Sequence, residues 1–306
     1  MKNYLSIDIG GTNIKYGILN RAGQIIEKDR IKTPDNLADF MQIMDQIISQ
    51  YIEEIRGIAF SCPGKIDAQT GTIYFGGALT YLHKLPLAQT IQDKYQVPVA
   101  VENDGKAAAL AELWLGNLQG VSEGAAIVLG TGVGGGVIMD GKLRKGVHDQ
   151  AGEFSFLINN KDAAGLSRFT ALNTSAVNMI RTCAKQLQLT DESDGLAVFQ
   201  AINQQDERVM PIFKQFCQSV GILILNIQAV VDLDQFVIAG GISAQPVVTE
   251  TIRAEYNAYL DSLQAASKMI TRPAIVSAKF FNDANLYGAL YHLLLQIDQA
   301  TMEAQS

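Results

Sequence analysis

The stretch that decides the fold lies at the start of the chain and reads Tyr4-Leu5-Ser6-Ile7-Asp8-Ile9-Gly10-Gly11-Thr12-Asn13-Ile14-Lys15-Tyr16-Gly17-Ile18-Leu19. Residues 4–9 alternate in the manner of a strand. Gly10 and Gly11 break that pattern, and residues 14–19 resume it. We therefore expect a strand, a glycine turn and a returning strand.

The following residues extend this opening into a sheet covered by helices. We expect a third strand over 24–32 and short buried strands over 57–60 and 97–101. Residues 35–52 carry apolar side chains at helical spacing, and a helix over 105–115 follows the last of these strands at once. Strands alternating with helices in this way predict an α/β fold.

The theme of the opening returns in the second half of the chain. A strand over 125–129 leads into the glycine-rich loop 130–136 and a further strand over 137–139. Placing Gly130 on Gly10 aligns the two first strands, and it also aligns Ile18-Leu19 with Ile138-Met139. We therefore expect a duplicated α/β domain with two glycine turns that face each other. The remaining elements expected are helices over 169–189, 195–202, 206–231, 246–260 and 283–297 and strands over 235–239 and 274–277.

Composition excludes several classes of protein. A chain of 306 residues should bury roughly 75% of its unfolded surface, and its length suggests two domains. With 24 basic and 31 acidic residues the net charge is −7, which argues against binding nucleic acid. The acidic Asp8 comes too early for a signal peptide, and the longest apolar stretch, 220–231, is too short to span a membrane.

The cysteines point the same way. Cys62, Cys183 and Cys217 are widely spaced, odd in number and form no C-x-x-C pair. This argues against a disulfide scaffold or a cysteine-rich zinc site and fits a reducing compartment. We expect a cytoplasmic protein with neither a membrane nor a nucleic acid as partner.

The glycine turns suggest phosphate binding. Glycines after strands expose backbone N–H groups, and rows of such groups bind anions. Because Asp8 would repel a bare phosphate, its presence in the first turn suggests Mg²⁺-phosphate. A pair of tight hairpins with a structural aspartate stays open as the alternative. The segment 130–135 also fits G-x-G-x-x-G, but no helix follows, which argues against a dinucleotide site.

A second group of polar residues stands at the end of the strand over 97–101. Asn103 and Asp104 are favoured helix N-caps, and a carboxylate at this end of a strand also points into the usual ligand crevice of an α/β sheet. By itself Glu153 is an ordinary surface acid. The histidines show no metal-ligand spacing, and we expect them to be structural or solvated: His83, His148 and His292.

These residues resemble the motifs of the ROK family (repressors, open reading frames and sugar kinases). Its two phosphate motifs resemble residues 8–13 and 129–136, and its adenosine motif resembles 239–243. Its sugar-site motifs resemble 61–64, 102–104 and 151–153, in the same order. The resemblance implies an α/β, duplicated actin-like (ribonuclease-H-like) ATPase fold, with ATP and sugar meeting in a cleft between two domains. We expect a smaller domain of residues 1–117 plus 284–306, on which the closing helix packs, and a larger domain of residues 118–283.

The resemblance also implies a role for each matching residue. Asp104 would be the general base, Asn103 and Glu153 would hold ring hydroxyls, and Gly64 would contact the sugar through its backbone. Asp8 would orient the water shell of Mg²⁺. The residues that would bind the phosphates are Gly10, Gly11, Thr12, Asn13, Gly130, Thr131, Gly132 and Gly134, and those that would approach the adenosine are Gly240 and Gly241.

The implied activity is that of an ATP:sugar phosphotransferase of the hexokinase type. It would transfer the γ-phosphate of ATP to a hexose hydroxyl, O6 being the expected one. Phosphoryl transfer needs a cation, N–H donors and one aligned carboxylate, all of which these motifs can supply. The family also implies a homodimer in the cytoplasm.

The sequence departs from the family in its sugar site. Many members have Glu-x-Gly-His and then a cysteine-rich zinc loop, whereas this chain has Glu153-Phe154-Ser155-Phe156 and no cysteine before Cys183. We therefore expect no structural zinc. The further sugar-binding glutamate has no counterpart in 166–174, and Gly105-Lys106 replaces the usual Ala-Asn.

These departures resemble a zinc-less branch that includes β-glucoside kinases and N-acetylmannosamine kinases, and they leave the sugar open. Phe156 is either an aromatic wall that stacks on a sugar ring or aglycone, or a simple packing residue.

Two other functions compete with a kinase. The missing histidine and glutamate suggest a catalytically inactive sugar-binding regulator, although Asp8 and Asp104 argue against it. A transcriptional repressor of the family would place a helix-turn-helix before the first glycine motif, and no room for one precedes Asp8. We expect the kinase.

Overall fold

The structure is a computed structural model that describes residues 2–305, and the chain in it divides into two compact units. The first unit comprises Met1–Gln119, Leu143–Ala151 and Asn282–Ser306, and the second comprises Gly120–Lys142 and Gly152–Phe281. Residues 143–151 thus group with the first unit. The domain limits expected from the sequence, at 117/118 and 283/284, stay a prediction.

The first unit is built on a five-stranded sheet in the order β3-β2-β1-β4-β7. Its strands are β1 (Asn3–Ile9), β2 (Asn13–Leu19), β3 (Ile25–Lys32), β4 (Ile55–Cys62) and β7 (Val99–Asn103). Strand β1 is antiparallel to β2 and parallel to β4, which is parallel to β7. The carboxyl ends of β1, β4 and β7 therefore lie at one edge of this sheet.

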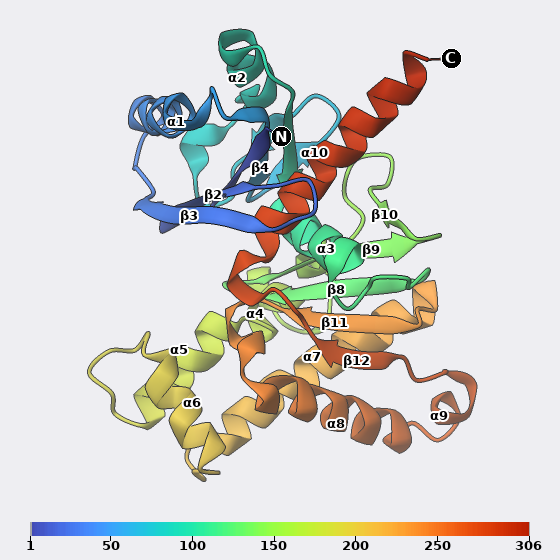
Figure 1. Cartoon of the computed structure of the whole chain (residues 1–306). Helices are drawn as coiled ribbons and strands as arrows, with labels where there is room; N and C mark the ends of the chain where they lie inside the picture. The colour runs from blue at the N-terminus through green and yellow to red at the C-terminus, as the bar shows by residue number, and fades with distance from the viewer. Residues whose placement is uncertain (1, 306) are drawn as a thin grey trace. The chain divides into compact units, whose positions relative to one another are not determined.

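Helices cover both faces of this sheet (Figure 1). One face packs against α1 (Leu37–Tyr51) and α2 (Leu87–Tyr95), and the other packs against α3 (Asp104–Leu115) and α10 (Ala284–Glu303). Asn36 caps α1, which buries Phe40, Met44, Ile47, Ile48 and Tyr51 along one side, as its apolar spacing predicts. Smaller elements of this unit are β5 (Lys65–Asp67), β6 (Thr72–Phe75), η1 (Thr80–Leu82) and η5 (Phe281–Asp283), whose first residue belongs to the second unit.

The second unit repeats this sheet, in the order β10-β9-β8-β11-β12. Its strands are β8 (Gly124–Leu129), β9 (Val133–Met139), β10 (Lys142–Arg144), β11 (Gln235–Ala239) and β12 (Ala274–Ser277), and the last two residues of β10 group with the first unit. An antiparallel hairpin is again followed by parallel strands, so β8 corresponds to β1 and β11 to β4. The expected duplication is confirmed.

The helices of the second unit bury one large apolar core against its sheet, and α7 packs beside α8 (Figure 1). They are η2 (Phe154–Phe156), η3 (Gly165–Arg168), α4 (Thr170–Asn173), α5 (Ala176–Gln186), α6 (Gly195–Asn203), α7 (Met210–Val231), η4 (Gly241–Ala244), α8 (Pro246–Ser262) and α9 (Ala266–Met269). Among residues 2–305, α7 alone has the length and apolarity of a membrane span, and half of its most apolar window is buried in this core.

Two expectations about local structure are wrong. In the first hairpin Ile9 pairs with Ile14, whereas in the second Leu129 pairs with Val133, so the second turn is one residue shorter. Ile18 therefore corresponds to Val137 rather than to Ile138. The single helix expected over 169–189 is also wrong, because Thr174 leaves helical geometry and the Ser175 side chain accepts the Asn178 N–H to begin α5 anew.

Candidate functional site

The first candidate site is the turn between β1 and β2. Gly11 and Thr12 are exposed at its tip, and the Gly10 N–H donates to the Asn13 carbonyl at 3.1 Å. Thr33 fixes the turn from the next strand, because its hydroxyl donates to the Gly10 carbonyl at 2.6 Å. The turn is thus a rigid loop whose tip is open to a ligand.

Asp8 lies beneath this turn and is buried. Its Oδ1 accepts from Asn285 Nδ2 at 2.9 Å, and its Oδ2 lies 3.6 Å from Lys15 Nζ. Burial raises the pKa of Asp8, while the hydrogen bond from Asn285 and the charge of Lys15 lower it in part. A carboxylate held out of water in this way would gain from a nearby cation.

Asn103 and Asp104 stand where β7 passes into α3, at the same edge of the sheet as Asp8. The Asn103 side chain accepts the Lys106 N–H at 3.2 Å, which confirms the expected N-cap. The same side chain donates to the Gly64 carbonyl at 2.9 Å, and Gly64 has a φ of 92°, which favours glycine. Asp104 is the first residue of α3, and its Oδ1 accepts the Gly105 N–H at 2.8 Å. The structure therefore brings Gly64, Asn103 and Asp104 together.

A network of charged groups is buried behind this segment. Glu102 Oε1 accepts the Asn103 N–H at 2.9 Å, and Glu102 Oε2 lies 3.5 Å from Lys145 Nζ and 3.6 Å from His292 Nδ1. Burial lowers the pKa of His292, although the charge of Glu102 raises it in part. Lys106, which is 2% exposed, donates from Nζ to the Asp149 carbonyl at 2.7 Å.

The second glycine turn lies in the second unit. The Gly130 N–H donates to the Gly132 carbonyl at 3.0 Å, and Thr131 is exposed at the tip. Gly240, at the end of the neighbouring strand β11, has a φ of 99° and lies so close to the Leu129 backbone that a side chain would collide with it. Gly134 is half-buried on β9.

A cavity of about 390 Å³ joins these motifs. Its walls are mainly aliphatic or aromatic, and backbone from both glycine motifs completes it. The residues that line it are Leu129, Gly130, Ala176, Val177, Ile180, Gly195, Leu196, Phe199, Gly241, Ile242 and Gln245. A flat apolar group with a few polar edge atoms, such as a nucleobase, fits this lining.

Glu153 lies beside the second hairpin. It precedes the buried Phe154, and the Ser155 hydroxyl donates to the Val133 carbonyl at 2.7 Å. Glu153 itself is half-buried. The predicted site residues thus fall into two groups: the first unit holds Asp8, Gly10, Gly11, Thr12, Asn13, Gly64, Asn103 and Asp104, and the second holds Gly130, Thr131, Gly132, Gly134, Glu153, Gly240 and Gly241.

Sequence reasoning missed several residues around these groups. Lys15 and Asn285 at Asp8, and Lys145 at Glu102, carry no local signal, since their partners are far away along the chain or on the facing strand. The 83% exposure of Leu196 at the start of an apolar helix is known only from the structure. Within residues 2–305 no group of three or more His, Cys, Asp or Glu side chains could hold a metal ion, and all three cysteines are free and buried.

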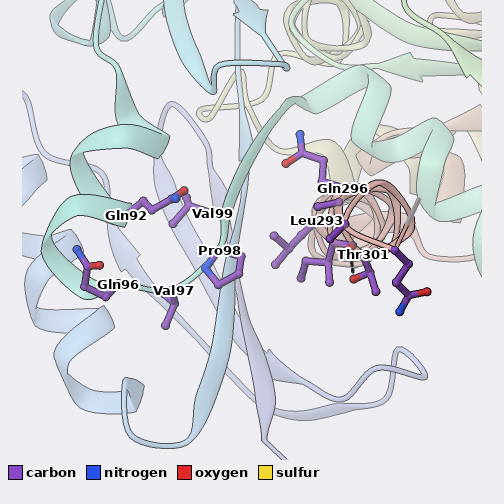
Figure 2. A pocket seen from close by; sticks show the side chains of 12 residues that line it. Gln92, Gln96, Val97, Pro98, Val99, Leu293, Gln296 and Thr301 are labelled. Atoms are coloured by element: carbon purple, nitrogen blue, oxygen red, sulfur yellow. Dashed lines mark hydrogen bonds between the residues drawn. The ribbon is translucent and has the colours of Figure 1, made fainter.

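A larger groove of about 660 Å³ lies elsewhere on the first unit, between the start of β7 and the second half of α10 (Figure 2). Gln92, Gln96 and Pro98 line one side, and Gln296 and Thr301 line the other. Its lining has no ionisable side chain and none of the predicted site residues. The groove therefore offers no group that phosphoryl transfer requires.

Two α/β units of the same topology, each with a glycine hairpin at its first two strands, define an actin-like ATPase fold. The chain belongs to the ROK family, whose sequence profile matches residues 4–296.

Its relatives in this family include named sugar kinases. The chain is 30% identical over 295 residues to a beta-glucoside kinase of Listeria innocua, covering 94% of this chain and 96% of the relative. It is 31% identical over 246 residues to an N-acetylmannosamine kinase of Vibrio cholerae, covering 78% and 83% of the two chains. A solved ROK family protein of Streptococcus pneumoniae in complex with sucrose superposes with a TM-score of 0.85 at 31% identity, over 97% of this chain and 99% of that one.

Proposed function

We propose that the protein is an ATP-dependent sugar kinase that transfers the γ-phosphate to O6 of a hexose-type sugar, with Asp104 as the general base. The observation that carries the proposal is the cluster at the carboxyl edge of the first sheet. There the Asn103 side chain donates a hydrogen bond to the Gly64 carbonyl, and Asp104 follows Asn103 in the chain. Asp8 lies near the end of β1, the strand beside β4, and the glycine turn follows it. The named sugar kinases among the relatives support the same class of reaction.

Each group has a role in this reaction. Asp104 accepts the proton of the sugar hydroxyl as the oxygen attacks the γ-phosphorus, and the bond to the leaving ADP breaks. Asn103, Glu153 and the Gly64 backbone hold the sugar. Thr12, Thr131 and the turn glycines bind the phosphates, while Gly240, Gly241 and the apolar cavity hold the adenosine.

The residues around Asp8 fit a Mg²⁺ ion held through its water shell. Asp8 is a hard oxygen donor whose buried carboxylate would be stabilised by a cation, and Mg²⁺ commonly takes one or two carboxylates together with substrate phosphates and water. When bound, the ion would neutralise phosphate charge. Asp8 would orient its waters, while Asn285 and Lys15 hold the carboxylate in place.

The remaining parts of the proposal concern the wider protein. We place it in the cytoplasm as a homodimer with the two domains expected from the sequence, 1–117 plus 284–306 and 118–283. We expect its sugar substrate to be a β-glucoside, N-acetylmannosamine or a common hexose, because the relatives are named as kinases of the first two.

The test is a screen for ADP release with glucose, mannose, N-acetylmannosamine, N-acetylglucosamine, allose, fructose and β-glucosides such as cellobiose. With the best substrate, Asp104→Asn should lower kcat by roughly 10²–10⁴-fold and leave ATP binding intact. Asp162→Asn, an exposed acid in the second unit, is the matched control. Near-normal turnover by the Asp104 variant would refute the base. Sugar binding by thermal shift without ADP release would identify a regulator instead.

A further inference from the structure

Two aromatic rings lie at the surface of the second unit, close to Glu153. Phe156 is 68% exposed, and its ring centroid lies 6.1 Å from that of Phe169, with the planes at 84°. This edge-to-face arrangement is a favourable geometry for an aromatic pair. The pair leaves most of the Phe156 side chain open to solvent.

The pair is held rigidly by the backbone on both sides. Phe154 is buried beneath it, against Gly135, where no side chain would fit. Ile158 forms a β-bridge with Phe169, and the Thr170 N–H donates to the Leu157 carbonyl at 2.8 Å. The two segments that carry the rings are thus joined by backbone hydrogen bonds. Little conformational freedom would therefore be lost when the rings bind a ligand.

The position of Phe156 relative to Glu153 follows from the short helix between them. The Phe156 N–H donates to the Glu153 carbonyl at 3.2 Å and closes one 3₁₀ turn. Glu153 is the N-cap of this turn, with a φ of −74° and a ψ of 63°, so Phe156 is its neighbour across a single hydrogen-bonded turn. Phe156 therefore lies one turn away from the residue that we propose as a sugar contact.

We propose that Phe156, supported by Phe169, binds the second ring of a glycoside whose first ring is phosphorylated. A pyranose or aryl ring linked to the sugar has an apolar face that can cover an exposed aromatic side chain, whereas Phe156 offers no hydrogen bond to hold a lone hexose. The substrate class is then a disaccharide or an aryl glycoside. This inference rests on the proposed function, because it takes Glu153 as a contact of the phosphorylated sugar.

The experiment compares kcat/KM for cellobiose and an aryl β-glucoside with that for glucose in Phe156→Ala. We expect a loss of about 3- to 10-fold with the two-ring substrates, mainly in KM, and less than a 2-fold change with glucose. Phe156→Tyr should restore the wild-type values. Leu166→Ala, which is 72% exposed in the same segment, is the matched control and should change neither substrate.

Several results would overturn the inference. An equal loss with glucose and with the glycosides would place Phe156 at the phosphorylated ring, and no loss with any substrate would remove it from the site. A change in oligomeric state by light scattering, with unchanged kinetics, would show that a second copy of the chain covers the pair.

The two proposals fail in distinguishable ways. If the wild type phosphorylates glucose but neither phosphorylates nor binds glycosides, the kinase stands and the glycoside site is refuted. If it releases no ADP with any sugar, yet calorimetry shows cellobiose binding that weakens in Phe156→Ala, the glycoside site stands and the kinase is refuted.

Discussion

The two glycine hairpins share a topology and differ in their chemistry. In the first, Asp8 pairs with Lys15 across the hairpin, whereas the corresponding pair in the second is Val128 and Gly134. The same contrast extends through the units. Among residues 2–305, the buried aspartate, glutamates, lysine and histidine all lie in the first unit, namely Asp8, Glu102, Lys106, Glu112 and His292.

Under the proposed function, this difference gives each half of the duplicated scaffold its own task. Buried charge is costly, and under the proposed function Asp8 is kept because it acts on a metal-bound phosphate. The second unit instead leaves an apolar cavity beside its glycine turn, which suits a nucleobase. The first unit can therefore be tested through its buried charge, and the second through the close packing of its glycine motifs.

Among the tests that compare the two units, the largest expected effect comes from removing the charge of Asp8 in the first hairpin. Asp8→Val gives the first hairpin the side chain that the second has at this position and should lower kcat by roughly 10²–10³-fold, because the carboxylate proposed to orient the water shell of Mg²⁺ is lost. The melting temperature should change little, since removal of a buried carboxylate offsets the loss of the hydrogen bond from Asn285. Steady-state kinetics and thermal unfolding measure the two quantities. Asp35→Val, at an exposed acid, is the control, and an active Asp8→Val would contradict the division of tasks.

A smaller effect is expected on the free energy of unfolding when the close backbone packing of the second unit is disturbed. Gly240→Ala places a side chain against the Leu129 backbone at a positive φ and should lower the free energy of unfolding by more than about 1 kcal/mol. At Gly130 a Cβ would meet nothing within 4 Å, so Gly130→Ala should be close to neutral. Denaturant unfolding would decide, and equal stabilities for the two variants would contradict the packing argument.

The smallest expected effect is a loss of folding stability at low pH. We expect it to arise in the first unit, because that unit holds the buried His292. Since burial lowers the pKa of His292 below its ordinary value of 6.5, the unfolded chain binds its proton first as the pH falls. The stability of the folded protein should therefore decrease below about pH 6.5 through this group. The charged groups that face it are Glu102 and Lys145.

His292→Gln should flatten this decrease in a series of unfolding measurements between pH 7 and pH 5. His148→Gln, at an exposed histidine, should leave it unchanged. If both variants keep the wild-type slope, the acid sensitivity belongs to other groups.

Much of the fold followed from local patterns in the sequence. Alternation over 4–9 and 125–129, broken by glycines, predicted both hairpins, because strand period and turn chemistry are properties of neighbouring residues. The same reasoning predicted a helix N-cap at Asn103 or Asp104, and in the structure Asn103 is the N-cap. It failed over 169–189, where apolar spacing suggested one helix and the hydroxyl of Ser175 begins another.

The sequence by itself determined the duplicated α/β plan, the two glycine turns and the chain positions of the candidate acids. Only the tertiary structure decided the strand register of the second hairpin, the bond from Asn103 to Gly64 and the burial of His292 against Glu102. The cavity between the glycine motifs and helices α5 and α6 also depends on the tertiary structure. The physical reason is distance along the chain: contacts between remote residues depend on turn lengths and helix packing, which no local period encodes.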